Sequence, residues 1–155
     1  MENIIQATKL TKVYGEKETS VTALDNIDVQ FNENEFTAIM GPSGSGKSTL
    51  LHCLAGLDRP TSGQILLKDQ DISTLNDKQL TKIRRDSFGF VFQAFNLIPT
   101  LTAEENITLP ASIAGRKPDM DWIKKVVETV DISDRLTHRP NELSGGQQQR
   151  VAAAR

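Results

Sequence analysis

The chain has 155 residues, a length that suits one domain with a buried core. Its 18 lysine and arginine residues nearly balance 20 aspartate and glutamate residues, and a formal net charge of -2 gives no overall basic field, so we expect no nucleic-acid partner. The single cysteine, Cys53, excludes a disulfide framework and a cysteine-based zinc site, and we expect it to pack as a small apolar residue.

The first six residues carry no basic region followed by an apolar stretch, which argues against a secretory signal peptide. No run of the chain approaches the roughly 18 apolar residues that a bilayer-spanning helix needs. We therefore expect a cytoplasmic protein whose membrane role, if it has one, comes through a partner or through sequence outside these residues.

Two strands are predicted at the start of the chain, over residues 4–13 and 23–31. In the second, Ile27, Val29 and Phe31 alternate with polar residues, which is typical of a half-exposed antiparallel strand. The two strands are expected to form one peripheral sheet.

Residues 36–40 are nearly all apolar, which predicts a central strand covered on both faces. A glycine-rich stretch and a predicted helix over residues 47–57 follow, and this order fits the phosphate-binding pattern G-x-x-x-x-G-K-[ST]. We expect backbone N–H groups of the loop and the Lys47 ammonium to hold the β- and γ-phosphates of a nucleotide, and the Ser48 hydroxyl to bind Mg²⁺. The alternative is a glycine-rich turn with an exposed lysine. The phosphate loop comprises Gly41, Pro42, Ser43, Gly44, Ser45, Gly46, Lys47, Ser48 and Thr49.

Beyond the loop, the sequence predicts a short strand over residues 63–68 and one or two helical turns over residues 78–85. Residues 88–92 have the aromatic and β-branched content of a further buried strand, with Gln93 at its end.

Helix signals dominate from Asn96 onward. Thr102 and Glu105 fit a capping box, and apolar residues between 120 and 130 recur at helical spacing. Residues 115–118 break the pattern into at least two helices. A helical subdomain is thus predicted between Gln93 and about Leu143.

A last helix is predicted after Leu143, with Ser144 as its N-cap. Gly145 and Gly146 would let backbone N–H groups approach an anion at the helix start, although an ordinary capped helix is the alternative. The helix has no stop signal before Arg155, so we expect the sequence to end within the element.

Taken together and in this order, the phosphate loop, a glutamine after a later strand, a helical insert and Leu-Ser-Gly-Gly-Gln resemble the nucleotide-binding domain of ABC transporters. The resemblance runs from about residue 4 to residue 155. It implies an α/β fold with a P-loop NTPase core, a peripheral antiparallel β subdomain and an inserted α-helical subdomain, incomplete at the C-terminus. One domain would then comprise a β-rich ATP-binding core at 1–93, the helical subdomain at 94–143 and a signature helix at 144–155.

The resemblance also implies roles for single residues. Tyr14 would stack on adenine, and Gln93 would contact Mg²⁺ and the attacking water, acting with Lys47 in catalysis. The signature residues would contact the γ-phosphate of ATP held by a second copy of the domain, which implies a head-to-tail dimer with ATP and Mg²⁺ as cofactors. These signature residues are Leu143, Ser144, Gly145, Gly146 and Gln147.

Residues 41–51, 56–63 and 89–97 look most like the lipoprotein, macrolide and antimicrobial-peptide exporters of the family. This likeness implies a transmembrane permease subunit as partner, contacted by residues 95–106, at the cytoplasmic face of the plasma membrane. The family carries an Asp-Glu pair and a histidine beyond the signature helix, so we expect residues 1–155 to bind ATP but to hydrolyse it poorly. A non-transport ABC ATPase of DNA repair or translation, and a module that dimerises around ATP without hydrolysis, remain alternatives.

Overall fold

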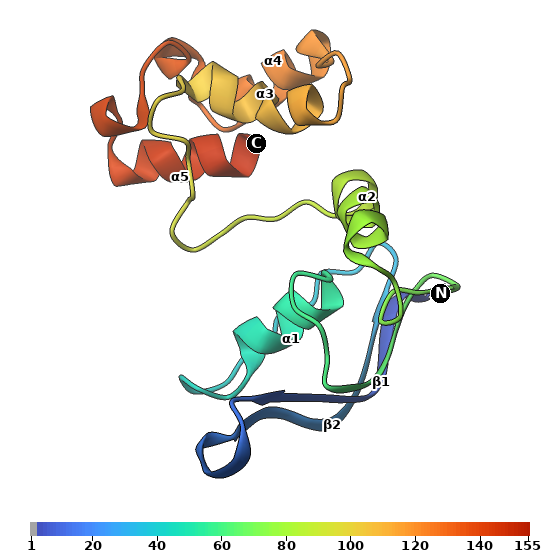
Figure 1. Ribbon diagram of the computed structural model, residues 1–155. Coiled ribbons are helices and arrows are strands. Elements are labelled where there is room, and N and C mark those ends of the chain that lie inside the picture. Colours follow the sequence, from blue (N-terminus) through green and yellow to red (C-terminus); the bar gives the residue numbers. More distant parts are fainter. Residues whose placement is uncertain (1–2) are drawn as a thin grey trace. The chain divides into compact units, whose positions relative to one another are not determined.

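The computed structural model describes residues 3–155, which form two compact units (Figure 1). The first unit ends at Phe88 and the second is Gly89–Arg155. The first contains all four strands of the described chain with two α-helices, and the second contains three α-helices.

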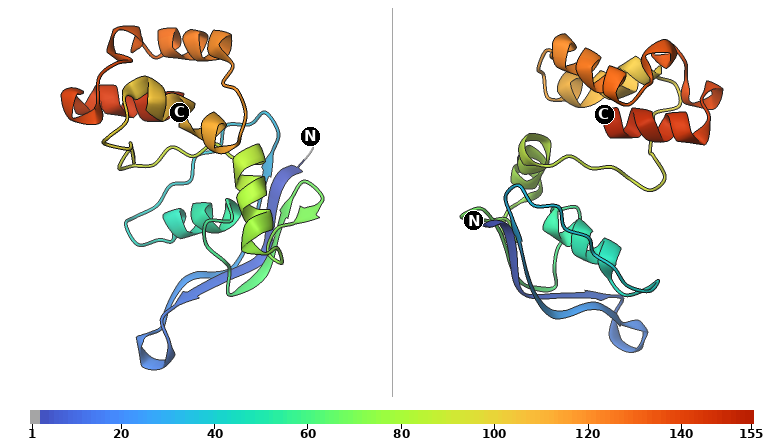
Figure 2. Two further views of the ribbon diagram at one scale, coloured as in Figure 1. Left: turned by 45° about the horizontal axis from the view of Figure 1, so that its top comes forward. Right: turned by 180° about the vertical axis from the view of Figure 1, so that it is seen from behind.

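The first unit is built on an antiparallel sheet with the strand order β2-β1-β3-β4. Its strands are β1 (Asn3–Tyr14), β2 (Val21–Asn32), β3 (Ser62–Leu67) and β4 (Gln70–Asp71), with the short helix η1 (Lys17–Thr19) joining the first two. The strands predicted over residues 4–13, 23–31 and 63–68 are therefore confirmed. Helix α1 (Lys47–Leu54) lies against one face of this sheet (Figure 2).

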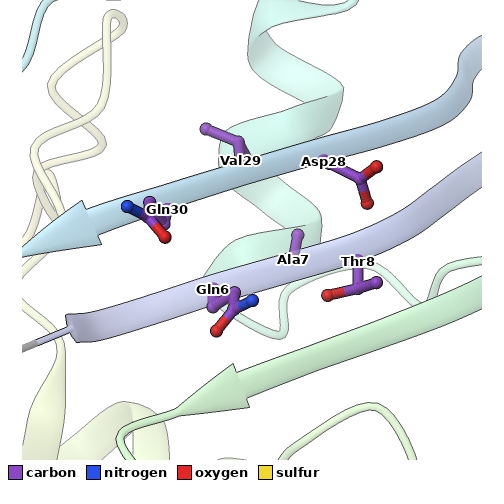
Figure 3. A pocket seen from close by; sticks show the side chains of 6 residues that line it. All are labelled: Gln6, Ala7, Thr8, Asp28, Val29 and Gln30. Carbon is purple, nitrogen blue, oxygen red and sulfur yellow. The ribbon is translucent and has the colours of Figure 1, made fainter.

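The pleat of β1 and β2 separates a core face from a polar face (Figure 3). Ala7 and Val29 point to the core side, where Ala7 is 1% exposed, whereas Gln6 and Thr8 point the other way. A bulge after Ala7 keeps Leu10 buried, and the carboxylate of Asp28 accepts a hydrogen bond from the N–H of Lys9 within it (2.7 Å). The core comprises Ile5, Ala7, Leu10, Leu24, Cys53, Leu54, Ile65, Ile72 and Leu80, which confirms the apolar packing expected of Cys53.

The other helix of this unit is α2 (Asp77–Ser87), which contains the turns predicted over residues 78–85 and extends beyond them at both ends. Asn76 and Gln79 form a capping box at its start, and Leu80 is the residue that α2 buries in the core.

The prediction of strands over residues 36–40 and 88–92 was wrong for the described chain. Both runs lie outside any strand, and the side chains of Phe36 and Met40 are 98% and 87% exposed. An apolar run becomes a strand only when a neighbouring strand takes its N–H and C=O groups, and no strand in residues 3–155 pairs with either run. The rings of Phe90 and Phe92 lie against each other instead, with centroids 4.6 Å apart.

The second unit is helical, as predicted. It contains α3 (Ala103–Ile113), α4 (Met120–Thr129) and α5 (Gly145–Ala154), with the short helices η2 (Ser133–Arg135) and η3 (Pro140–Glu142) between the last two. The capping box of Thr102 and Glu105 and the N-cap at Ser144 are confirmed. None of the helices in the described chain has the length and apolar character needed to cross a bilayer. The core of the unit comprises Ala103, Ile107, Val127, Ile132, Leu143 and Val151.

A fully buried amide, Asn106 of α3, fixes the segment that precedes this helix. Its Oδ1 accepts a hydrogen bond from the N–H of Ile98 (2.7 Å), and its Nδ2 donates to the carbonyl oxygens of Ile98 (3.2 Å), Leu101 (3.2 Å) and Thr102 (2.9 Å). One side chain therefore binds a segment that forms no ladder or helix of its own.

Replacing Asn106 with alanine should lower the free energy of unfolding by about 2 kcal/mol, because buried backbone groups lose their partners. Urea unfolding measures the loss. Asn141→Ala, which truncates an exposed asparagine in the same unit, is the matched control. Equal stability of the two variants would contradict the role given to Asn106.

Candidate nucleotide-binding site

The phosphate loop packs closely on β2 through Gly46. This residue has φ +82°, and a Cβ atom there would lie far inside van der Waals contact of the Ala23 carbonyl oxygen. Only glycine therefore allows the observed approach of the loop to the strand. A hollow of about 240 Å³ results, lined by Ala23 and residues 43–49.

Helix α1 begins at this hollow without a side-chain cap. Its N-cap position is Gly46, whereas α2, α3, α4 and α5 begin with the capping side chains of Asn76, Thr102, Asp119 and Ser144. The first N–H groups of a helix need acceptors, and the helix dipole favours a negative one. The start of α1 is thus suited to an anion that takes the place of the missing cap.

Lys47 lies over the same loop. Its ammonium donates hydrogen bonds to the carbonyl oxygens of Gly41 (2.9 Å) and Pro42 (2.7 Å) and to Oγ of Ser45 (3.3 Å). These acceptors are neutral, and a phosphate oxygen would form a stronger, charge-assisted bond with the same group. Ser48, the proposed Mg²⁺ ligand, is exposed in the first turn of α1.

Tyr14 ends β1 beside the strand that supports the loop. Val13 and Tyr14 pair with Thr22 and Val21 of β2, next to Ala23. The Tyr14 residue is 41% exposed, and its hydroxyl donates to Oδ2 of Asp58 (2.7 Å). This hydrogen bond, with a smaller effect of burial, raises the pKa of the Tyr14 phenol above its ordinary value.

The signature residues begin α5 in the second unit. Oγ of Ser144 accepts from the N–H of Gln147 (3.3 Å), and Oε1 of Gln147 accepts from the N–H of Ser144 (2.8 Å). Gly145 and Gly146 are exposed, and a Cβ atom on either would meet nothing within 4 Å. Nothing inside the unit requires glycine there, so these two residues leave a helix start open to a molecule from outside.

The start of α5 has a buried anchor residue and a hollow beside it. Leu143 differs from the other signature residues because it is buried in the core, where it anchors the motif. A hollow of about 440 Å³ lies at the start of α5, lined by Asp131, Asp134, Arg135, Ser144, Gly146, Gln147 and Arg150.

Gln93 lies in an exposed turn of the second unit. The following residues, Phe95 and Asn96, have left-handed φ values of 58° and 48°. The guanidinium of Arg155 donates to their carbonyl oxygens, at 2.8 Å and 2.6 Å, and so joins this turn to the end of α5. Sequence reasoning did not assign this contact to Arg155, because no local signal marks a bond between residues so far apart in the chain.

A further hollow, of about 400 Å³, lies on the polar face of β1 and β2 (Figure 3). Its carboxylate, Asp28, already accepts the backbone bond from Lys9. The described residues also contain no cluster of three or more histidine, cysteine, aspartate or glutamate side chains placed to hold a metal ion. The groups described above as suited to an anion are those of the phosphate loop and of the start of α5.

Sequence comparison matches the chain to a known family and to known proteins. The sequence profile of a family described as "ABC transporter" matches residues 24–155. The macrolide export ATP-binding/permease protein MacB of Marinobacter nauticus is 46% identical over 154 residues, covering 98% of this chain and 24% of that protein. The lipoprotein-releasing system ATP-binding protein LolD of Cytophaga hutchinsonii is 45% identical over 157 residues, covering 100% of this chain and 70% of that protein.

A solved structure is also similar. The dimeric post-hydrolysis state of the ATP-binding cassette MJ0796 of Methanocaldococcus jannaschii, bound to ADP and Pi, matches with a TM-score of 0.86 and 45% identity. The match covers 97% of this chain and 67% of that one. This similarity confirms the predicted α/β P-loop NTPase fold.

Proposed function

Because the chain belongs to the ABC transporter family, we propose that it is the ATP-binding subunit of an exporter and couples ATP binding and hydrolysis to transport through a separate membrane subunit. The observation that carries this proposal is the uncapped, glycine-started α1 with Lys47 over its loop. The names of the relatives, macrolide export and lipoprotein release, favour an amphiphilic drug, a peptide or a lipoprotein as the substrate. The subunit would then work at the cytoplasmic face of the plasma membrane, bound through its permease.

Each site residue has a proposed role. Backbone N–H groups of the phosphate loop and the Lys47 ammonium bind the β- and γ-phosphates, and the Tyr14 ring stacks on the base. The Ser48 hydroxyl and the Gln93 side chain are oxygen donors of the kind that Mg²⁺ prefers, and Mg²⁺ would neutralise charge that develops on the phosphates. Gln93 also orients the attacking water.

We propose that two copies share each site. The MJ0796 cassette is a dimer bound to ADP and Pi, and the open glycines of α5 suit contact with a phosphate held by the other copy. Backbone N–H groups at the start of α5 would supply charge stabilisation in trans. We propose the functional division of an ATP-binding core at 1–93, a helical subdomain at 94–143 whose residues 95–106 contact the permease, and a signature helix at 144–155.

A mixture of two variants, each of which lacks a different part of the shared site, tests whether two copies form it together. Lys47→Ala removes the phosphate ligand, and Gly146→Asp places a negative charge beside the γ-phosphate of the other copy. The aspartate lies in the first turn of α5, where the helix dipole favours it, so the fold of that variant should be preserved. Light scattering with Mg²⁺ and ATP should find each variant monomeric alone.

The mixture should form ATP-dependent dimers, because the mixed pair holds one intact site made from the Gly146→Asp phosphate loop and the Lys47→Ala signature. Wild-type protein without nucleotide is the monomeric control. A mixture that stays monomeric while the wild type dimerises would exclude sites shared between copies.

A further inference from the structure

Lys12, Tyr14 and Asp58 form a cluster, here called the tyrosine clamp, beside the proposed nucleotide site. The Asp58 carboxylate receives two side-chain hydrogen bonds, from the Tyr14 hydroxyl at Oδ2 (2.7 Å) and from the Lys12 ammonium at Oδ1 (2.7 Å). The same ammonium donates to the carbonyl oxygen of Arg59 (2.7 Å) and lies 4.8 Å from the centroid of the Tyr14 ring. Three side chains from β1 and from the segment after α1 therefore hold one another.

The clamp is partly shielded from water while its aromatic ring remains accessible. The side chains of Lys12 and Asp58 are 13% and 29% exposed. The Tyr14 residue is 41% exposed. The ammonium covers one face of the ring through a cation–π contact, and Asp58 holds the hydroxyl at its edge. The ring is thus fixed by one face and one edge.

We propose that Lys12 and Asp58 are positioning residues, which hold the Tyr14 ring so that the base of a bound nucleotide stacks on the face that Lys12 leaves open. This inference rests on the proposed ATP-binding function and adds to it a reason for base affinity. A tyrosine at an exposed strand end would otherwise lose side-chain freedom only when the nucleotide arrives, which reduces the affinity gained by stacking. A ring that is already fixed avoids this cost.

The ionisation of the cluster agrees with this arrangement. Burial alone would raise the pKa of Asp58, but hydrogen bonds from Lys12 and Tyr14 outweigh it and hold the pKa of the carboxyl below its usual value. Asp58 is therefore a carboxylate at neutral pH. The hydrogen bond between Asp58 and Tyr14, together with the burial of the Tyr14 hydroxyl, raises the pKa of the Tyr14 phenol. Thr49 and Lys12 have smaller opposing effects on this pKa.

The first measurement compares two ligands that differ in having a base. In Asp58→Asn, the affinity for ATP should fall roughly fivefold because the ring loses its fixed orientation, whereas the affinity for inorganic tripolyphosphate should not change. Lys12→Met should act in the same direction. Asp77→Asn is the matched control, because it also removes a carboxylate from an ion pair (2.8 Å), and the Asp77 carboxylate pairs with the Arg59 guanidinium and not with Lys12 or Tyr14. Equal losses for ATP and tripolyphosphate would show a general structural effect and overturn the inference.

The wild-type protein separates failure of this inference from failure of the proposed function. If tripolyphosphate binds as tightly as ATP, the base contributes nothing to affinity. The inference about the tyrosine clamp is then contradicted, whereas the phosphate site is not. Binding of neither ligand would overturn the nucleotide site itself, and the clamp with it.

A second measurement tests whether Asp58 acts through Tyr14. In a Tyr14→Phe background, which lacks the hydroxyl, Asp58→Asn should cause a smaller loss of ATP affinity, because only its bond to Lys12 then acts on the ring. An undiminished loss in that background would contradict the inference.

The spectrum provides an independent readout, because Tyr14 is the single tyrosine of the chain. Its phenolate absorbance in a titration at high pH should appear at lower pH in Asp58→Asn than in the wild type, since the carboxylate no longer disfavours the phenolate. An unchanged titration would show that Asp58 does not hold the hydroxyl in solution.

Discussion

Replacing Lys47 with alanine is expected to weaken ATP binding at least about tenfold, because one charge-assisted bond to phosphate contributes roughly 1.5–3 kcal/mol. The ammonium already lies over the phosphate loop, bonded to Gly41, Pro42 and Ser45. A phosphate oxygen would replace these neutral acceptors without moving the rest of the loop. Calorimetric titration with ATP measures the effect.

The same change should cost little stability. The three bonds of Lys47 are exposed to solvent, where such interactions contribute at most about 1 kcal/mol in total. Lys78→Ala, which removes the same charge from an exposed position of α2, is the matched control. ATP affinity that is equal in the two variants would contradict the assignment of the phosphate loop.

Gly46→Ala should destabilise the protein far more than Gly44→Ala, although both glycines lie in one loop with nearly the same φ, +82° and +80°. The left-handed conformation alone costs a side chain about 1–2 kcal/mol, and this cost applies to both. At Gly44 a Cβ meets nothing within 4 Å, whereas at Gly46 it would overlap the carbonyl oxygen of Ala23. We expect a loss of at least about 3 kcal/mol for Gly46→Ala, because backbone must move to relieve the overlap.

Urea unfolding of the two variants gives the comparison, with nucleotide affinity as a second readout. Gly46→Ala should also bind ATP weakly, since the loop can no longer sit against β2. Similar stabilities for the two variants would show that the loop does not pack on Ala23 as described.

Much of the fold follows from local patterns in the sequence. Alternation along β2, the capping box at Thr102 and the break near Gly115 depend on neighbouring residues, so they are readable without tertiary information. Asn34 has φ 60°, a left-handed conformation that asparagine tolerates through its own short polar side chain. The strand predicted over residues 36–40 depended instead on a distant partner strand, which an apolar run does not reveal.

The candidate site likewise has parts that the sequence reveals and parts that it does not. The phosphate loop and the signature are contiguous stretches whose chemistry is visible in their spacing. The tyrosine clamp is not, because Lys12 and Tyr14 meet Asp58 across 46 and 44 positions of the chain. An aspartate after a helix gives no local sign that it will bind a tyrosine at a strand end.

The glycines of the two motifs are under different kinds of constraint. Gly46 is required by a neighbouring backbone atom of its own unit, whereas Gly145 and Gly146 have open space around them. Selection for a folded chain is therefore enough to retain the first, but the other two are retained only while something outside the unit needs to come close. In a duplicated copy that drifts under relaxed selection, Gly145 and Gly146 would be free to change while Gly46 stayed. In such a copy, changes at Gly145 and Gly146 with Gly46 unchanged would indicate that contact with the partner was lost while the fold was kept.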